Sequence, residues 1–134
     1  MSKSNATETD LLAKVFKATA LPWDSAQHLE IHLHTGDPGE GGTSATSEAT
    51  YTGYAPVPVT RSVAGWTVSG NSSVNAALIQ FNQCTGGTNT ISHVSITPSA
   101  STQILYSGAL NSNLSVANLI QPQFNSGSLT ITED

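Results

Sequence analysis

Histidine recurs on one face of a short extended segment, directly before a dense turn signal. The segment His28–His34 reads HLEIHLH, so three histidines and Glu30 alternate with leucine and isoleucine. Alternation with a period of two predicts a strand with one polar and one apolar face. Neighbouring imidazoles on such a face lie about 7 Å apart. Imidazole is a common metal ligand and a common acid or base, so this face is the part of the chain that could do chemistry.

A metal site of this kind is similar to that of cupin barrels, which hold a divalent metal with His-x-His, a following Glu and a distant His. His32 and His34 supply the pair, but Glu40 comes one residue late and His93 lacks the Pro-x-Gly lead-in. The apolar side of the strand must be buried, so the histidines are expected to point outward, to solvent or to a neighbouring subunit. The sequence therefore predicts no metal and no cofactor, and it makes His32 and His34 candidate interface residues.

Other catalytic and binding patterns are missing from the sequence. It contains no Gly-x-Ser-x-Gly nucleophile elbow, and its glycine-rich segments lack the lysine and helix of a phosphate loop. The single cysteine, Cys84, excludes an internal disulfide and is expected to be buried. The net charge of −5 argues against binding to a phosphate backbone. We expect a protein that is not an enzyme and has no nucleic-acid partner.

The composition predicts one packed domain. The chain has 134 residues, 37% hydrophobic content and 10% charged residues, against roughly 25% charged in an average soluble protein. Ser, Thr and Asn supply most of the polar surface. No apolar run approaches the roughly 20 residues that cross a bilayer, and the N-terminus does not resemble a signal peptide. We expect a soluble protein assembled in the cytoplasm, with no membrane partner.

Residues 1–24 differ from the rest of the chain and predict a helical arm. Thr7 or Thr9 is a candidate N-cap, and Pro22 ends the segment. The arm carries an apolar stripe of Leu11, Leu12, Val15 and Phe16. So short a helix is marginal alone, so it should dock either on its own domain or on a neighbour. Trp23 is expected in the core, with a contact surface as the alternative.

Residues 25–134 follow a pattern of strand, turn and strand. The candidate strands cover residues 28–34, 50–61, 64–69, 74–82, 91–97, 102–107, 109–117 and 128–132. Pro56 and Pro58 predict an edge or bulged strand, and Trp66 and Phe81 are the expected core anchors. The predicted fold is all-β, an antiparallel, jelly-roll-like sandwich of about eight strands after a short N-terminal helix.

Several segments resemble a family of small virion structural proteins of tailed bacteriophages. They are LHTGDPGEGG at 33–42, YTGYAPVPVTRSVAGWTVSGN at 51–71, CTGGT at 84–88, LYSGAL at 105–110 and SLTITED at 128–134. The resemblance covers about residues 29–134, and the chain departs from the family in its N-terminal helix and its proline pair. Family members are described as tail-fibre components or as capsid cement (decoration) proteins, and they carry no catalytic residues to transfer.

The resemblance implies a virion protein, and the sequence favours a cement protein because it has neither heptads nor a fibrous repeat. Such a protein would bind the major capsid protein on the outer surface of the head and contact other copies of itself, as a dimer or trimer. The interface candidates are Leu11, Leu12, Val15, Phe16, Trp23, His32 and His34. The alternatives are a tail- or head-fibre component that binds the host surface and a cupin-like metal-dependent enzyme.

Overall fold

The computed structural model describes residues 1–134 and is built mainly from antiparallel strands. Its largest sheet has five strands in the order β1-β8-β7-β2-β3. These strands are β1 (Ser2–Lys3), β8 (Tyr106–Val116), β7 (Asn89–Pro98), β2 (His28–His34) and β3 (Val57–Thr60). The bounds of β2 are those that the alternating histidines predict.

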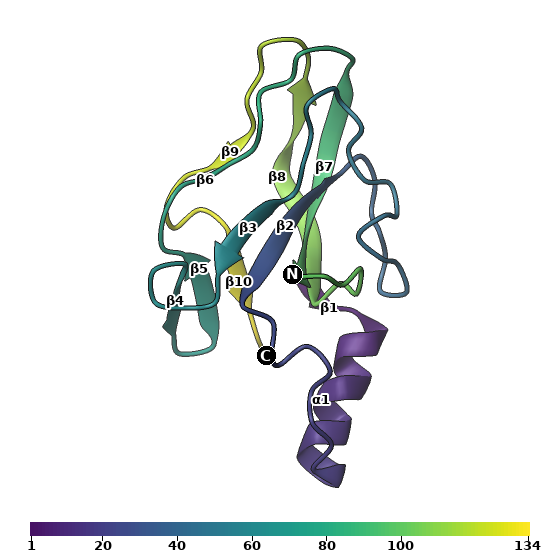
Figure 1. Cartoon of the computed structure of the whole chain (residues 1–134), viewed down its shortest axis with the longest axis vertical. Helices are drawn as coiled ribbons and strands as arrows, with labels where there is room; N and C mark the ends of the chain where they lie inside the picture. Colours follow the sequence, from purple (N-terminus) through teal and green to yellow (C-terminus); the bar gives the residue numbers. More distant parts are fainter.

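Two smaller sheets lie beside the large one (Figure 1). The first has three strands in the order β10-β5-β4, and the second pairs β6 with β9. Their bounds are β4 (Trp66–Ser69), β5 (Ser72–Asn75), β6 (Ile79–Gln80), β9 (Gln123–Phe124) and β10 (Thr130–Thr132). Together they form the second layer of a sandwich.

The core lies between these layers and confirms the predicted all-β sandwich. Phe81 is buried as expected, and Trp66 is partly buried against the core. Cys84 is also fully buried. The main cluster consists of Ile31, Leu33, Ala49, Tyr51, Ile79, Phe81, Cys84, Ile91, Val94, Ile96, Val116, Leu129 and Ile131. The chain has ten strands, of which β1, β6 and β9 have two residues each and are too short to leave an alternating pattern. The expected strand over 74–82 is wrong at 76–78, because β5 ends at Asn75 and β6 begins at Ile79.

The proline pair has the predicted consequence, but the strand around it is shorter than expected. β3 lies at the edge of the five-stranded sheet and contains Pro58, which needs no ladder donor there. The expected strand over 50–61 is wrong before Val57, because Tyr51 and Tyr54 belong to a loop that packs against the core. The expected strands 102–107 and 109–117 are largely one strand, β8, because Gly108 pairs with Val94 and no turn forms.

The helix α1 (Asn5–Lys17) precedes the sandwich and extends away from it (Figure 1). Ser4 is the N-cap, and its side chain accepts a hydrogen bond from the Thr7 N–H at 3.2 Å, so the predicted caps are wrong. The hydroxyls of Ser4 and Thr7 both donate to the Ile104 carbonyl, which fixes the first turn on the sandwich. No helix is long and apolar enough to cross a membrane.

Candidate functional site

The imidazole of His34 is completely buried at the end of β2. Its Nδ1 lies 2.8 Å from the Thr46 carbonyl oxygen, and its Nε2 lies 2.7 Å from Ser95 Oγ. A carbonyl only accepts, so Nδ1 carries the proton, and the Ser95 hydroxyl donates to Nε2. Burial lowers the pKa of His34, and the Thr46 carbonyl only partly offsets this effect. His34 is therefore a neutral side chain with both nitrogens paired.

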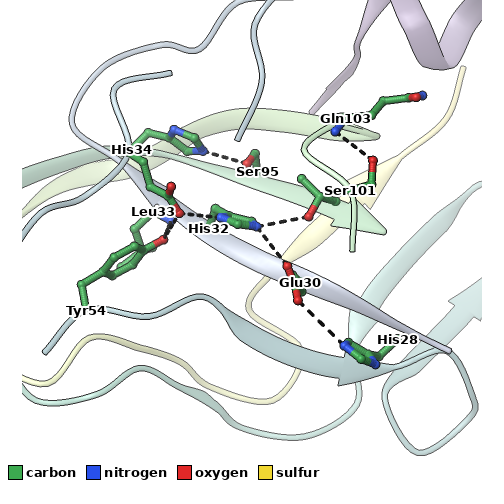
Figure 2. A network of polar contacts seen from close by, with 11 residues as sticks. His28, Glu30, His32, Leu33, His34, Tyr54, Ser95, Ser101 and Gln103 are labelled. Atoms are coloured by element: carbon green, nitrogen blue, oxygen red, sulfur yellow. Dashed lines mark hydrogen bonds and ion pairs between the residues drawn. The ribbon is translucent and has the colours of Figure 1, made fainter. Parts of the chain in front are cut away.

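His32 lies one pleat earlier and joins a chain of polar contacts. Its Nδ1 donates to the Glu48 carboxylate at 2.6 Å, and its Nε2 lies 3.1 Å from Thr97 Oγ1. The Tyr54 hydroxyl also donates to Glu48, at 2.9 Å, and accepts the Leu33 N–H at 3.1 Å. Burial, followed by the nearby Glu48 charge, raises the pKa of the Tyr54 hydroxyl. Figure 2 shows the chain continuing along β2 through Glu30 to His28.

The expectation that these histidines point outward is therefore wrong. His32 and His34 are 5% and 0% exposed, because the loop between β2 and β3 covers them and supplies Thr46 and Glu48 as partners. The alternating residues of His28–His34 correctly predict one polar and one apolar face of β2. They do not indicate that the loop between β2 and β3 covers the polar face. His32 and His34 cannot contact another protein while this loop is in place.

The structure also separates Glu40 from the two histidines. Nowhere do three or more His, Cys, Asp or Glu side chains gather in an arrangement that could hold a metal ion. The acidic partner of His32 is Glu48, while the exposed Glu40 contributes its backbone carbonyl, which accepts the Asn5 N–H at 3.0 Å. The histidine face is a hydrogen-bonded network that fastens a long loop to β2.

The apolar side of α1 is the largest of the predicted interface features that remains accessible. Leu12, Val15 and Phe16 are 59%, 71% and 78% exposed, and Leu11 is partly buried. Each of these side chains is more often buried than exposed in a monomeric protein. Of the two docking sites that the sequence left open, the structure shows no packing of this face on the chain's own sandwich.

Trp23 does not belong to the core, so that expectation is wrong. The ring is half-buried, its Nε1 donates to Asp10 Oδ2 at 3.1 Å, and the Arg61 guanidinium lies 6.0 Å from the ring centroid. Gln103 also donates to Asp10, at 2.8 Å. Trp23 therefore braces α1 against the loop that leads into β2, which fixes the direction in which the helix projects.

A second exposed apolar pair lies on the loop between β8 and β9, at the opposite end of the long axis from α1 (Figure 1). Leu119 and Ile120 are 69% and 42% exposed. Leu119 has a φ of +76°, a left-handed conformation that is unfavourable for leucine. Two backbone hydrogen bonds with Cys84, both 2.8 Å, hold the pair in place. The loop therefore presents its apolar side chains rigidly.

A cleft of about 670 Å³ opens between the two layers of the sandwich. Leu29 and Ile96 line it from the five-stranded sheet, and Trp66, Val68 and Ile131 line it from the three-stranded sheet. No residue of α1 lines it. The volume falls within the range of ligand and peptide sites, so the cleft is a second apolar surface open to a partner.

The sequence does not predict that Glu48 and Tyr54 join the His32 network, and it does not predict the cleft. Glu48 lies in a Ser- and Thr-rich loop with no periodicity, so nothing local indicates that it pairs with His32. The one available signal was a set of three carboxylates (Asp37, Glu40 and Glu48) downstream of a histidine-bearing strand, and nothing in the sequence indicates which of them pairs with a histidine. The cleft depends on how two sheets meet, which no local pattern encodes.

Comparison with protein families gives the class of the chain as a structural protein of a bacteriophage virion. The model of the family described as podophage GP4 fiber I protein gp80 matches residues 2–132, and the chain belongs to this family. A search among curated proteins found no match. The expected virion protein is confirmed at this level.

Proposed function

We propose that the chain is a capsid cement, or decoration, protein that binds the outside of the major capsid protein shell. In this proposal each subunit bridges adjacent capsomers and stabilises the head against the pressure of packaged DNA. The observation that carries the proposal is the exposure of large apolar side chains at both ends of the molecule, on α1 and on the β8–β9 loop. A bridging subunit needs two separate contact surfaces, and a compact sandwich sets the distance between them.

The contacts are mechanical in this proposal, and the chain is not an enzyme. Burying one exposed Leu, Val or Phe side chain stabilises a contact by about 1.5–3 kcal/mol. A few such side chains at each end make a modest contact, and the symmetry of a shell repeats it many times. The β8–β9 loop, with Leu119 and Ile120, is assigned to the capsid protein, and α1 to the next component of the shell.

A fibre component that binds the host surface is the second candidate, and the family description favours it because it names a fiber protein. In a fibre, α1 would anchor the subunit to the virion and the far end of the sandwich would face the host. Both candidates use α1 as an attachment surface. They differ in what the β8–β9 loop contacts.

Binding to two targets tests the choice. Purified protein is mixed with expanded, DNA-free heads that lack it and, separately, with host cells, and sedimentation measures the bound fraction. A cement protein binds the heads with a stoichiometry set by their symmetry, and Leu119→Asn weakens that binding at least tenfold. Asn tolerates the left-handed conformation at this position, so the fold is retained.

The matched control is Leu78→Ser, which removes a half-exposed leucine elsewhere on the surface and should leave head binding unchanged. Electron microscopy of the intact virion locates the protein independently. Binding to host cells without binding to heads, together with density on a fibre and none on the head, would replace the cement proposal by the fibre one.

A further inference from the structure

We infer that the apolar face of α1 docks into the cleft between the two sheet layers of a second copy of this chain. This inference rests on the proposed function in one respect, namely that α1 is an assembly surface. It adds the identity of the partner, which is a second copy of the chain. The contact is between two different patches of the same protein. It would link neighbouring subunits on the virion to each other.

The two surfaces match in shape and chemistry. Leu12, Val15 and Phe16 stand at positions i, i+3 and i+4, which places them on one side of a helix. An apolar groove that receives such a row is a recurrent mode of peptide recognition. The cleft of about 670 Å³ offers an apolar floor, including Ile96 and Ile131, and the exposed Val68 stands at its rim.

The helix does not occupy the cleft of its own chain. Ser4 and Thr7 are bonded to the Ile104 carbonyl, and Asp10 is held by Trp23 and Gln103, so the first half of α1 is fixed at two places. The apolar row lies in the half of α1 that follows this fixed part, and α1 as a whole extends away from the sandwich (Figure 1). The helix and the cleft are therefore both unpartnered within one copy, and each is available to another.

Charge favours the same pairing. Lys14 and Lys17 lie in the last turn of α1, beside the apolar row. Glu133 lines the cleft, and Asp134 follows it. The cleft is also lined by Arg61, and both charged lining residues are paired within the chain, Glu133 with Lys3 and Arg61 with Asp24 at 3.8 Å. The exposed Asp134 forms no ion pair and remains as an acidic group next to the cleft. A basic helix end and an acidic cleft edge attract each other, and this attraction offsets part of the repulsion between copies that each carry a net charge of −5.

Helix-to-cleft docking has a defined consequence for assembly. Two copies that exchange helices reciprocally close a dimer, whereas one-way docking leaves a free helix and a free cleft and continues into a ring or a chain. In either case a variant with a damaged helix keeps an intact cleft. A variant with a damaged cleft keeps an intact helix.

Complementation between two variants tests the inference in solution, without capsids. Phe16→Ser damages the helix face and Val68→Asp damages the cleft, and both side chains are more than 70% exposed, so the fold is retained. Sedimentation equilibrium measures the self-association of each protein, and circular dichroism checks folding. We expect each variant alone to associate at least tenfold more weakly than the unaltered protein. An equimolar mixture should form a 1:1 heterodimer, because one intact helix then meets one intact cleft.

Leu78→Ser, outside both surfaces, serves as the control and should associate like the unaltered protein. Three results would overturn the inference: an unaltered protein that stays monomeric at millimolar concentration, a Val68→Asp variant that associates normally, or a mixture that does not recover association. Self-association that follows the expected pattern in a protein that binds no heads would overturn the cement proposal alone.

Discussion

His34 shows how a side chain suited to chemistry serves structure instead. Both of its nitrogens are bonded within the chain, and no solvent reaches the ring. The Ser95 hydroxyl can either donate to Nε2 or accept from it, so hydrogen bonding alone does not fix the charge of the ring. Burial does, because a second proton would place a positive charge away from water, and this lowers the pKa of His34. The contact between β2 and its covering loop is therefore sensitive to protonation.

Stability should consequently fall in mild acid. The pKa of His34 lies below its ordinary value of 6.5 in the folded protein, so between pH 6.5 and that lower pKa the unfolded chain binds the extra proton and the folded chain does not. The free energy of unfolding then decreases as pH falls, by up to about 1.4 kcal/mol per pH unit. Urea unfolding of the native protein and of His34→Gln at pH 7.5 and 5.5 measures the effect. We expect a smaller pH dependence in the variant.

His28→Gln is the matched control, because His28 lies on the same face of β2 but has a partly exposed side chain. This variant should keep the pH dependence of the unaltered protein. An equal loss of stability in acid for the native protein and His34→Gln would show that another group is responsible.

At the scale of elements, the turn between β3 and β4 depends on the absence of a side chain at Gly65. A Cβ placed there would lie 2.1 Å from the Thr60 carbonyl oxygen and 2.9 Å from Val59 Cγ1. The turn also supplies Ser62 and Val63 to the lining of the cleft. The packing of this turn therefore positions one wall of the cleft.

Gly65→Ala should lower the free energy of unfolding by about 3 kcal/mol, the upper end of the range for overpacking, because the clash is with backbone. Gly70 is the control, since it has a φ of +59° but open space around it. Gly70→Ala should cost about 1 kcal/mol, for the left-handed conformation alone. Thermal and denaturant unfolding of both variants measures the difference, and equal losses would contradict the steric explanation.

The sequence predicts elements well where the pattern is local. The alternation in His28–His34 gives β2 its bounds, and the proline pair indicates an edge strand. Patterns that depend on distant partners were missed. Leu114 alternates with the buried Val116 and lies opposite the buried Ile91 of β7, yet it is 36% exposed, which the alternation within β8 does not indicate.

Of the candidate site, the sequence likewise predicts the features that depend on local spacing and misses those that depend on distant residues. The apolar row of α1 follows from helical spacing, and its exposure is consistent with a contact surface. The burial of His32 and His34 follows from a loop whose polar residues meet them only after folding, so spacing along β2 alone could not reveal it.

At the scale of the molecule, the main hydrophobic core belongs to the sandwich and not to the arm. None of the thirteen buried residues of the main core comes from residues 1–20. Removing these residues should leave a folded sandwich with a lower free energy of unfolding, because the Lys3–Glu133 ion pair and the β1–β8 pairing are lost. The division into an arm over 1–24 and a sandwich over 25–134 predicts this outcome.

Circular dichroism and thermal unfolding of the truncated protein test this, together with its sedimentation with heads. We expect retained strand signal, a lower melting temperature and weaker attachment. A truncated protein that fails to fold would show that α1 is part of the folding unit, and the arm would then not be a separate domain.

The anchoring of α1 on Ile104 also sets an order of events during synthesis. The acceptor for Ser4 and Thr7 lies about a hundred residues downstream, and the ion partner of Lys3 lies 130 positions away. Because translation runs from the N-terminus, the helix leaves the ribosome long before the groups that aim it exist. The helix is therefore fixed in its final direction only when the chain is nearly finished. If α1 joins subunits as we infer, this order delays premature joining of nascent chains on one polysome.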